Sequence, residues 1–313
     1  MKPDVVVHCD WSKDAAKRWQ AKATRDGGSW RLELPQRVGS TEDVLDRMRE
    51  GAKPGRLFAG FDFPIGLPLT YGARTGLDGF REAVEAFGCA GAWQDWFAVC
   101  DDASQISLHR PFYPMRPGGR RLAHLLDGLA LDGVSARRLC ERRTASRPAA
   151  CMLFWTLGGN QVGKAAATGW QEILKPNLPR IGLWPFDGDL HSLLAQRDIV
   201  VAETYPGEVY DHLGIPRRPV WSKRKQAGRA SVGGHLLART TQRGHGLAEG
   251  LADVIRNGFS DRADGEDQFD ALVGLLGMLD VVDGHRPEGA PRDPAISGWE
   301  GWILGQQHQA ASG

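Results

Sequence analysis

The sequence lacks the cysteine pattern, apolar runs and leader segment that mark several large classes of protein. Its five cysteines are odd in number and never form a Cys-x-x-Cys pair or Cys/His zinc spacing, so we predict reduced thiols and no structural zinc. No apolar run reaches the roughly 18 residues of a membrane span. The first residues become charged too early for a signal peptide. We therefore expect a cytoplasmic protein with no membrane span.

The sequence also lacks an excess of charge of either sign. It contains 39 Lys and Arg against 38 Asp and Glu, which gives a formal net charge of +1. A nucleic-acid-binding role would therefore have to rest on local basic patches. It contains no HExxH zinc motif and no GxSxG nucleophile motif. Its 313 residues, 42% of them hydrophobic, are enough for one large globular domain or two modest ones.

The first 68 residues predict the element order β-β-β-α-β. The apolar run at 4–12 predicts a buried strand, and the alternating stretches at 17–27 and 28–38 predict a hairpin. Residues 40–52 open with a Ser/Thr cap signal and continue with apolar residues at helical spacing. Residues 56–66 predict a further strand, which Pro and Gly close.

The remainder of the chain predicts mainly helices and loops. Between 72 and 195 several stretches have helical character, including "WQDWFAVC" at 93–100, and further helices are predicted around 231–257. We expect a single α/β domain over 1–313, in which helices flank a mixed sheet. The helical region at about 72–195 is then an insertion, and about 306–313 is a disordered tail.

Acidic residues stand at the ends of three predicted strands. Asp10, Asp62 and Glu203 each follow an apolar run, and Asp267 and Asp270 lie three residues apart on one face of the last predicted helix. The carboxyl ends of parallel strands meet at one edge of a sheet. Carboxylates gathered there repel one another unless a cation neutralises them, and oxygen ligands favour Mg²⁺ or Mn²⁺. Each acid alone could instead cap a helix, end a turn or form a salt bridge.

Two basic segments could contact phosphate groups. The stretch "GGNQVGK" at 158–164 partly matches a nucleotide phosphate loop, but Ala165 stands where Ser or Thr would hold magnesium. It predicts either a structural turn or a phosphate contact through Lys164. A second basic loop, at 216–229, has no acidic residue. It includes Lys223, Arg224 and Lys225. That loop, like the arginine-rich stretch at 116–147, could follow a phosphate backbone or form a solvated surface.

Four short motifs carry a resemblance to a known family. They are "GFDFPIGLP" at 60–68, "AETYPGEVYDHLG" at 202–214, "FDALVGLLGML" at 269–279 and "GWEGWILG" at 298–305. Together with the β-β-β-α-β order, they resemble a family of predicted nucleases with an RNase H-like fold. The resemblance runs from the first strand to residue 305 and implies an RNase H-like mixed sheet with a helical insertion.

The resemblance implies a site that binds two divalent ions. Asp10 is then the bridging ligand, Asp62 and Asp270 complete the site, and Asp267 is an alternative ligand or helper. Glu203 is either a further ligand or a residue that orients the attacking water. The leading hypothesis is a Mg²⁺- or Mn²⁺-dependent nuclease that acts on DNA, RNA or a phosphorylated nucleotide. The alternative is a non-catalytic protein that binds nucleic acid or nucleotides on the same fold. An actin-like or sugar-kinase protein would need a second copy of the β-β-β-α-β unit, which the sequence does not contain.

Overall fold

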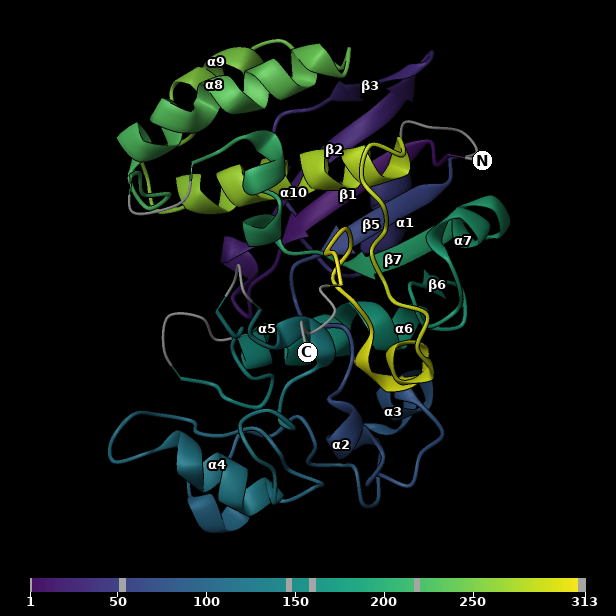
Figure 1. Ribbon diagram of the computed structural model, residues 1–313, viewed down its shortest axis with the longest axis vertical. Coiled ribbons are helices and arrows are strands. Elements are labelled where there is room, and N and C mark those ends of the chain that lie inside the picture. Colours follow the sequence, from purple (N-terminus) through teal and green to yellow (C-terminus); the bar gives the residue numbers. More distant parts are fainter. Residues whose placement is uncertain (1, 51–54, 145–147, 158–161, 217–219, 309–313) are drawn as a thin grey trace. The chain divides into compact units, whose positions relative to one another are not determined.

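The computed structural model divides the chain into two compact units. It describes all residues except 1, 51–54, 145–147, 158–161, 217–219 and 309–313 (Figure 1). The first unit consists of Met1–Asp62 and Asp189–Glu288, and the second of Phe63–Gly188 and Gly289–Gly313. The region expected as an insertion at about 72–195 thus corresponds to a unit that begins earlier and includes the C-terminal residues.

A mixed β-sheet forms the centre of the first unit. Its strands are β1 (Val5–Asp10), β2 (Trp19–Asp26), β3 (Ser29–Leu32), β4 (Gln36–Arg37), β5 (Leu57–Phe61), β7 (Ile199–Glu203) and β8 (Gly246–Leu247). They follow the order β7-β5-β1-β2-β3-β8, and β4 pairs with β2. The strands β7, β5 and β1 are parallel, whereas β1, β2 and β3 are antiparallel. The α/β class and the hairpin between residues 17 and 38 are therefore confirmed.

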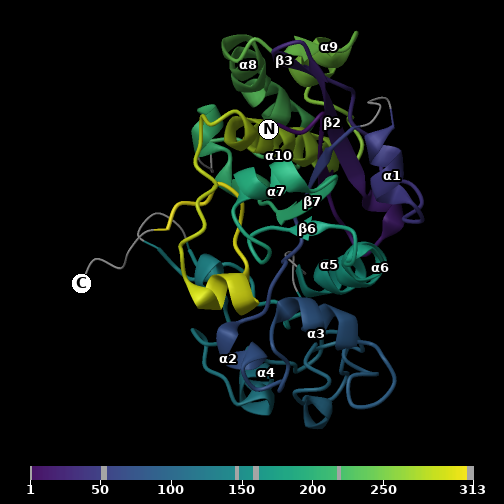
Figure 2. The same ribbon diagram turned by 90° about the vertical axis from the view of Figure 1, so that its right-hand side faces the viewer.

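The central strands are apolar because both faces of the sheet are covered. All five residues of β5 and of β7 are buried, as are the first five of β1. Near-continuous apolar runs are typical of parallel strands buried on both faces. Helix α10 (Gly265–Val282) packs against β1 and β2. Helix α1 (Val44–Arg49) lies on the opposite face (Figure 2).

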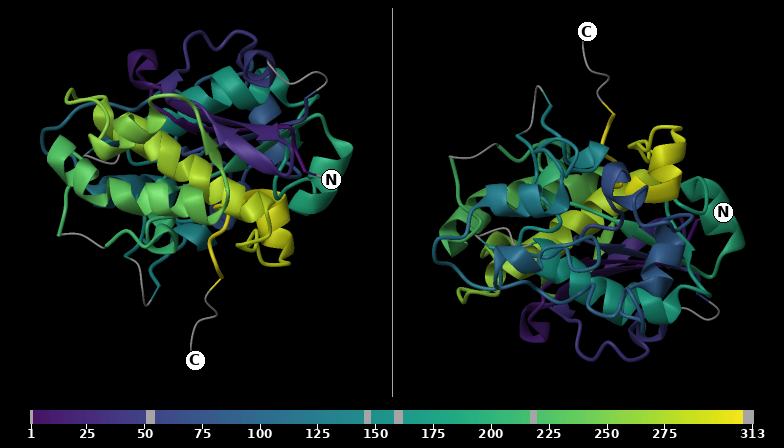
Figure 3. Two further views of the ribbon diagram at one scale, coloured as in Figure 1. Left: turned by 90° about the horizontal axis from the view of Figure 1, so that it is seen from above. Right: turned by 90° about the horizontal axis from the view of Figure 1, so that it is seen from below.

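The other helices of this unit are α7 (Leu190–Gln196), α8 (Gln226–Gln242) and α9 (Leu251–Arg256). Helix α8 runs beside α10 (Figure 3). The sequence correctly predicts α8, α9 and α10. The predicted Ser/Thr cap of α1 is wrong, because the helix begins after Asp43, whose φ is 50° and whose side chain makes no capping hydrogen bond.

Helix α10 lies close to the sheet because two glycines face its neighbours. A Cβ atom added to Gly274 would lie 2.2 Å from Nε2 of His8 on β1. One added to Gly277 would lie 2.6 Å from a methyl carbon of Val209. These distances are far below van der Waals contact, so the close packing of α10 requires glycine at both positions.

The second unit is built from short helices around an aromatic cluster. Its elements are α2 (Leu69–Gly72), α3 (Phe80–Ala86), α4 (Leu122–Leu129), α5 (Val162–Gly169), α6 (Lys175–Asn177) and the short strand β6 (Gly182–Leu183). Trp96 is fully buried and stacks on Phe87 and Trp170 at centroid distances of 3.9 and 5.3 Å.

The helix predicted at 93–100 is wrong, because residues 93–97 form turns and residues 98–100 have no regular secondary structure. Its apolar residues pack in the aromatic cluster around Trp96, where ring stacking provides the contacts that a helix face would otherwise make.

The predicted disordered tail begins with Gln306, which is buried and donates a hydrogen bond to the carbonyl of Cys140 at 2.9 Å. Residues 309–313 lie outside the described part of the chain. Over the described ranges, no helix combines the length and the apolar character that a membrane crossing needs.

Candidate carboxylate site

Asp10 and Asp62 are neighbours at the carboxyl edge of the sheet in the first unit. Cys9 pairs with Phe61 in the parallel ladder between β1 and β5, so the next residue on each strand is an aspartate. The Asp10 carboxyl donates a hydrogen bond to Asp62. Asp62 also accepts the backbone N–H of Trp11 at 2.6 Å. The two carboxyls therefore form a pair that shares a proton, and the protein backbone holds one of them in place.

Helix α10 brings further acids toward this pair. Asp270 lies in the second turn of α10 and is buried, and both of its oxygens are bound. Oδ1 accepts a hydrogen bond from the hydroxyl of Tyr210 at 2.8 Å, and Oδ2 accepts one from the ammonium of Lys223. The same ammonium lies 3.0 Å from Oε1 of Glu266. Asp267, between these two acids in sequence, is partly buried.

The pKa values show how these acids affect one another. Burial raises the pKa of Asp10 well above its ordinary value, and the charges of Asp62, Asp270 and Asp267 raise it further. Burial also raises the pKa of Asp62, to about 7, although the Trp11 amide opposes the shift. The pKa of Asp267 rises to about 6 through burial and the charges of Glu266 and Asp270. The acids of β1, of the end of β5 and of α10 thus repel one another electrostatically, and this repulsion favours the binding of protons or cations.

Lys223 counters part of this negative field. Burial lowers the pKa of its ammonium, but Asp270 and Glu266 outweigh that effect and hold the pKa above its ordinary value. Its charge also lowers the pKa of Asp62. The site therefore already contains one cation, which the protein itself supplies.

The donor atoms of the site fit a hard divalent ion in their chemistry. As placed, no three Asp, Glu, His or Cys side chains of the described residues are grouped closely enough to hold a metal ion. Asp10 and Asp62 bind each other, and Asp270 binds Lys223. All the acceptors are carboxylate oxygens, which Mg²⁺ and Mn²⁺ prefer. Asp10, Asp62 and Asp270 are the residues that would hold such an ion, with Asp267 beside them.

Glu203 does not join this group. It is buried in β7, where its ladder partner is Phe61 rather than Asp62. Successive side chains in a strand point to opposite faces of the sheet. Gly60 faces Met278 of α10, so Asp62, two residues later, shares the α10 face, whereas Phe61 and Glu203 belong to the other face. The sequence places Glu203 correctly at a strand end, but the register pairs it with the residue before Asp62, so the two acids belong to opposite faces of the sheet.

The predicted phosphate-binding residues separate into three groups. Lys223 binds the acids of the first unit, as described above. Arg224 and Lys225 are exposed and precede α8. Lys164 lies on α5, in the second unit. Beside it Gly163 is buried, and an added Cβ would lie 2.2 Å from the carbonyl oxygen of Leu153, so packing accounts for that glycine. The preceding residues of the loop, 158–161, lie outside the described ranges.

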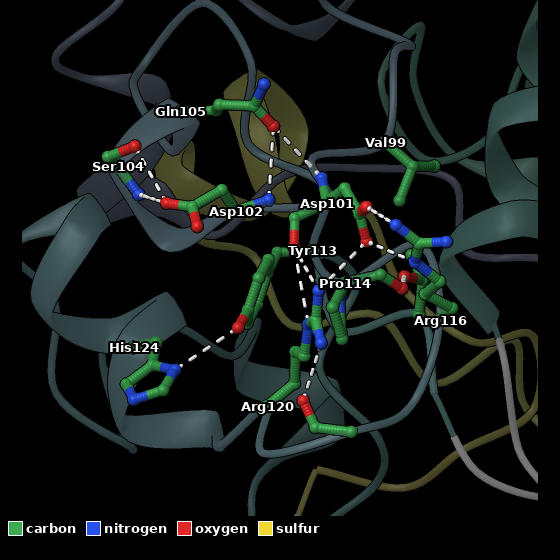
Figure 4. Close-up of polar contacts among 12 residues, drawn as sticks. Val99, Asp101, Asp102, Ser104, Gln105, Tyr113, Pro114, Arg116, Arg120 and His124 are labelled. Carbon is green, nitrogen blue, oxygen red and sulfur yellow. Dashed lines mark hydrogen bonds and ion pairs between the residues drawn. The ribbon is translucent and has the colours of Figure 1, made fainter.

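Several arginines of the basic stretch at 116–147 have acidic partners within the second unit. Arg116 and Arg120 both bind Asp101, at 2.6 and 3.2 Å (Figure 4). Arg138 is fully buried and binds Glu141 at 2.8 Å. Acidic partners within the unit thus partly neutralise these arginines, which argues against a continuous phosphate-binding surface along this stretch.

Sequence reasoning missed two residues of the acidic site, Tyr210 and Glu266. Tyr210 lies within the motif at 202–214, and its signal was an aromatic hydroxyl seven residues after Glu203, the last residue of β7. Glu266 lies directly before Asp267, and its position one turn before Asp270 could have been read from the helical period.

The chain matches no known family model, and no curated protein and no solved structure matches it either.

Proposed function

We propose that this protein is a divalent-metal-dependent phosphodiester hydrolase that acts on nucleic acid or on a phosphorylated nucleotide. The observation that carries the proposal is the convergence of Asp10, Asp62 and Asp270 in one electrostatic field. These residues come from β1, the end of β5 and α10, which are far apart in the sequence. Buried like charges are costly, and sites that keep them are frequently functional.

The order of the elements supports an RNase H-like arrangement as part of this proposal. Three antiparallel strands, β1 to β3, are followed by the two-residue strand β4, by α1 and then by β5, which returns parallel to β1. Helix α10 covers the face to which Asp10 and Asp62 belong. Apart from β4, this is the order on which the resemblance to predicted nucleases rests.

The residues of the chain have distinct tasks in this proposal. Bound Mg²⁺ or Mn²⁺ ions would supply activation of water and stabilisation of the leaving oxygen. Asp10, Asp62 and Asp270 would hold them. The amide of Trp11 fixes the direction of the Asp62 carboxylate, and the hydroxyl of Tyr210 does the same for Asp270. Such outer contacts orient metal ligands before the ion arrives.

The test is cleavage of labelled single- and double-stranded DNA and RNA in the presence of Mg²⁺ or Mn²⁺. Asp10→Asn and Asp62→Asn should each lower the rate at least about 100-fold, because each removes a charged ligand. Asp253→Asn is the matched control, since Asp253 is an exposed acid on α9, and it should cleave like the wild type. Equal rates in all three variants would overturn the assignment.

A second candidate function is a non-catalytic protein that binds nucleic acid or nucleotides. The observation that favours it is the Lys223 ammonium, which already neutralises Asp270. A site stabilised in this way needs no metal ion to persist. Calorimetry separates the two functions. The binding protein would take up oligonucleotide without measurable affinity for Mn²⁺, whereas the hydrolase would bind Mn²⁺ alone.

A further inference from the structure

We propose that Lys223 occupies the cation position of Asp270 until a divalent ion displaces it, so that the affinity for metal is set by competition with this side chain. The inference deepens the proposed hydrolase function and rests on it. It assigns Lys223 as a positioning residue of the acidic site, rather than as the direct phosphate contact that the sequence predicts.

Lys223 is bound to one of the two carboxylate oxygens through which Asp270 would hold a metal ion. Asp270 has two carboxylate oxygens, and Tyr210 and Lys223 take one each. A neutral hydroxyl that donates to Oδ1 can remain in place when a metal ion binds Oδ2. The ammonium opposes such an ion, because it is bound to the same oxygen and carries charge of the same sign. Metal binding at Asp270 therefore competes with Lys223 for that oxygen.

The Lys223 side chain can be displaced because it is flexible and partly exposed. Lysine is a compact charge on a flexible four-carbon stem, so it can leave one partner without any movement of the backbone. Lys223 is about a quarter exposed, at 24%, whereas the Asp270 side chain is only 8% exposed. The Lys223 side chain thus reaches solvent in part, while the Asp270 carboxylate is almost enclosed. The second partner of Lys223, Glu266, is 27% exposed and can keep the displaced ammonium close by.

Lys223 and a divalent ion differ in how much of the negative charge of the acidic site they neutralise. Lys223 brings a single positive charge to a group in which Asp10, Asp62, Asp267 and Asp270 act on one another. A divalent ion brings two charges and more ligand positions, so it neutralises this group more completely. The exchange is favourable when the ion is abundant. When the ion is scarce, the lysine keeps the acids from repelling one another.

Calorimetric titration with MnCl₂ alone tests the competition. Lys223→Met removes the competing charge and keeps the apolar stem, so Mn²⁺ should bind about tenfold more tightly than to the wild type. Lys225→Met is the matched control, because it removes the same charge from an exposed position two residues away, and its affinity should be that of the wild type. Lys223→Arg keeps the cation and should also bind like the wild type.

A measurement on the unaltered protein covers the case in which Lys223→Met does not fold. Acylation of lysines by a water-soluble ester is followed by peptide mass spectrometry, with and without MnCl₂. Lys223 should be modified several-fold faster with the ion present, because its carboxylate partners no longer hold the ammonium. Lys225 is the internal reference and should react at an unchanged rate.

The outcomes separate this inference from the proposed function. Tighter Mn²⁺ binding in Lys223→Met, or faster acylation of Lys223 with Mn²⁺, supports displacement. Mn²⁺ binding with equal affinity in both proteins and an unchanged acylation rate overturns the displacement but leaves the hydrolase proposal standing. If neither protein binds Mn²⁺, both proposals are overturned.

Discussion

The side chain of Asp62 holds a proton far more firmly than an ordinary aspartate does. Burial is the main cause, and the nearby charge of Asp270 adds to it. The pKa of Asp10 is shifted in the same direction, and its carboxyl donates a hydrogen bond to Asp62. A pair of this kind titrates as a unit, so its protonation affects the stability of the whole unit.

This pair predicts that stability falls as the pH rises. The pKa of Asp62 is about 7 in the folded protein, against 3.8 for an ordinary aspartate. Between these values the folded state binds more protons than the unfolded state does. The free energy of unfolding of the metal-free protein should therefore decrease from about pH 4 to pH 7. Urea denaturation at several pH values measures this slope.

Asp62→Asn should flatten this decrease, because asparagine does not titrate and cannot repel Asp10 or Asp270. The variant should be more stable than the wild type at pH 7.5 and should differ less at pH 4.5. Asp253→Asn again is the control and should follow the wild-type slope. Parallel curves for wild type and Asp62→Asn would show that the two acids do not share a field.

Single residues of the site differ in how far the sequence could reveal them. Asp10 and Asp62 were predictable, because each follows an apolar run and parallel strand ends meet at one edge. The face of Glu203 was not predictable, because a shift of one residue in register reverses the face, and register depends on tertiary packing. The role of Lys223 was also hidden, since nothing in a basic loop tells which acid it will meet.

At the scale of the secondary structure element, helix α10 determines how the site is assembled. Its residues from Phe269 to Val281 are all buried, and its first turns carry Glu266, Asp267 and Asp270. One helix thus supplies both a packing surface for the sheet and the acids at the sheet edge. Its position over β1 depends on the absence of a side chain at Gly274.

A pair of glycine substitutions tests this dependence. Gly274→Ala should destabilise the protein by about 1–2 kcal/mol, because overpacking against His8 outweighs the gain in helix propensity. Gly234→Ala on α8 is the matched change, since no atom lies within 4 Å of the added Cβ. It should stabilise the protein by up to about 1 kcal/mol. Thermal denaturation measures both, and equal effects of the two changes would contradict the close packing of α10.

Elements with a clear hydrophobic period were predictable from sequence alone. The alternation at 17–38 indicated the hairpin of β2 and β3, and the apolar residues after Asp267 indicated α10. Residues 93–100 have a comparable apolar content but form turns and irregular structure, because aromatic stacking around Trp96 supplies the stabilisation there. Aromatic spacing does not distinguish these two outcomes, since rings pack well on helices and on loops.

At the scale of the whole molecule, both compact units are discontinuous in sequence. The first unit contains every acid of the candidate site, and the second contains Lys164 and the paired arginines of Figure 4. The sequence predicted a helical region in the middle of the chain. Its membership with the C-terminal residues was not predictable, because it rests on contacts such as that of Gln306 with Cys140.

Hydrogen exchange on the intact protein tests where metal ions act. Addition of MnCl₂ should slow amide exchange at 9–12, 60–62 and 266–271, which lie far apart in the chain but border one site. Helices α3 and α4 of the second unit provide the internal control and should exchange at unchanged rates. Slowing that is spread evenly over both units would indicate general stabilisation instead of a site at the sheet edge.

The long separation in sequence between α10 and the strands that it covers has a consequence for biosynthesis. A nascent polypeptide presents β1 and β5 early, but the helix that covers them begins only at Gly265 and leaves the ribosome much later. Until then, the apolar surface under α10 is open to chaperones or to other chains. A premature stop codon before residue 265 should therefore yield an insoluble product.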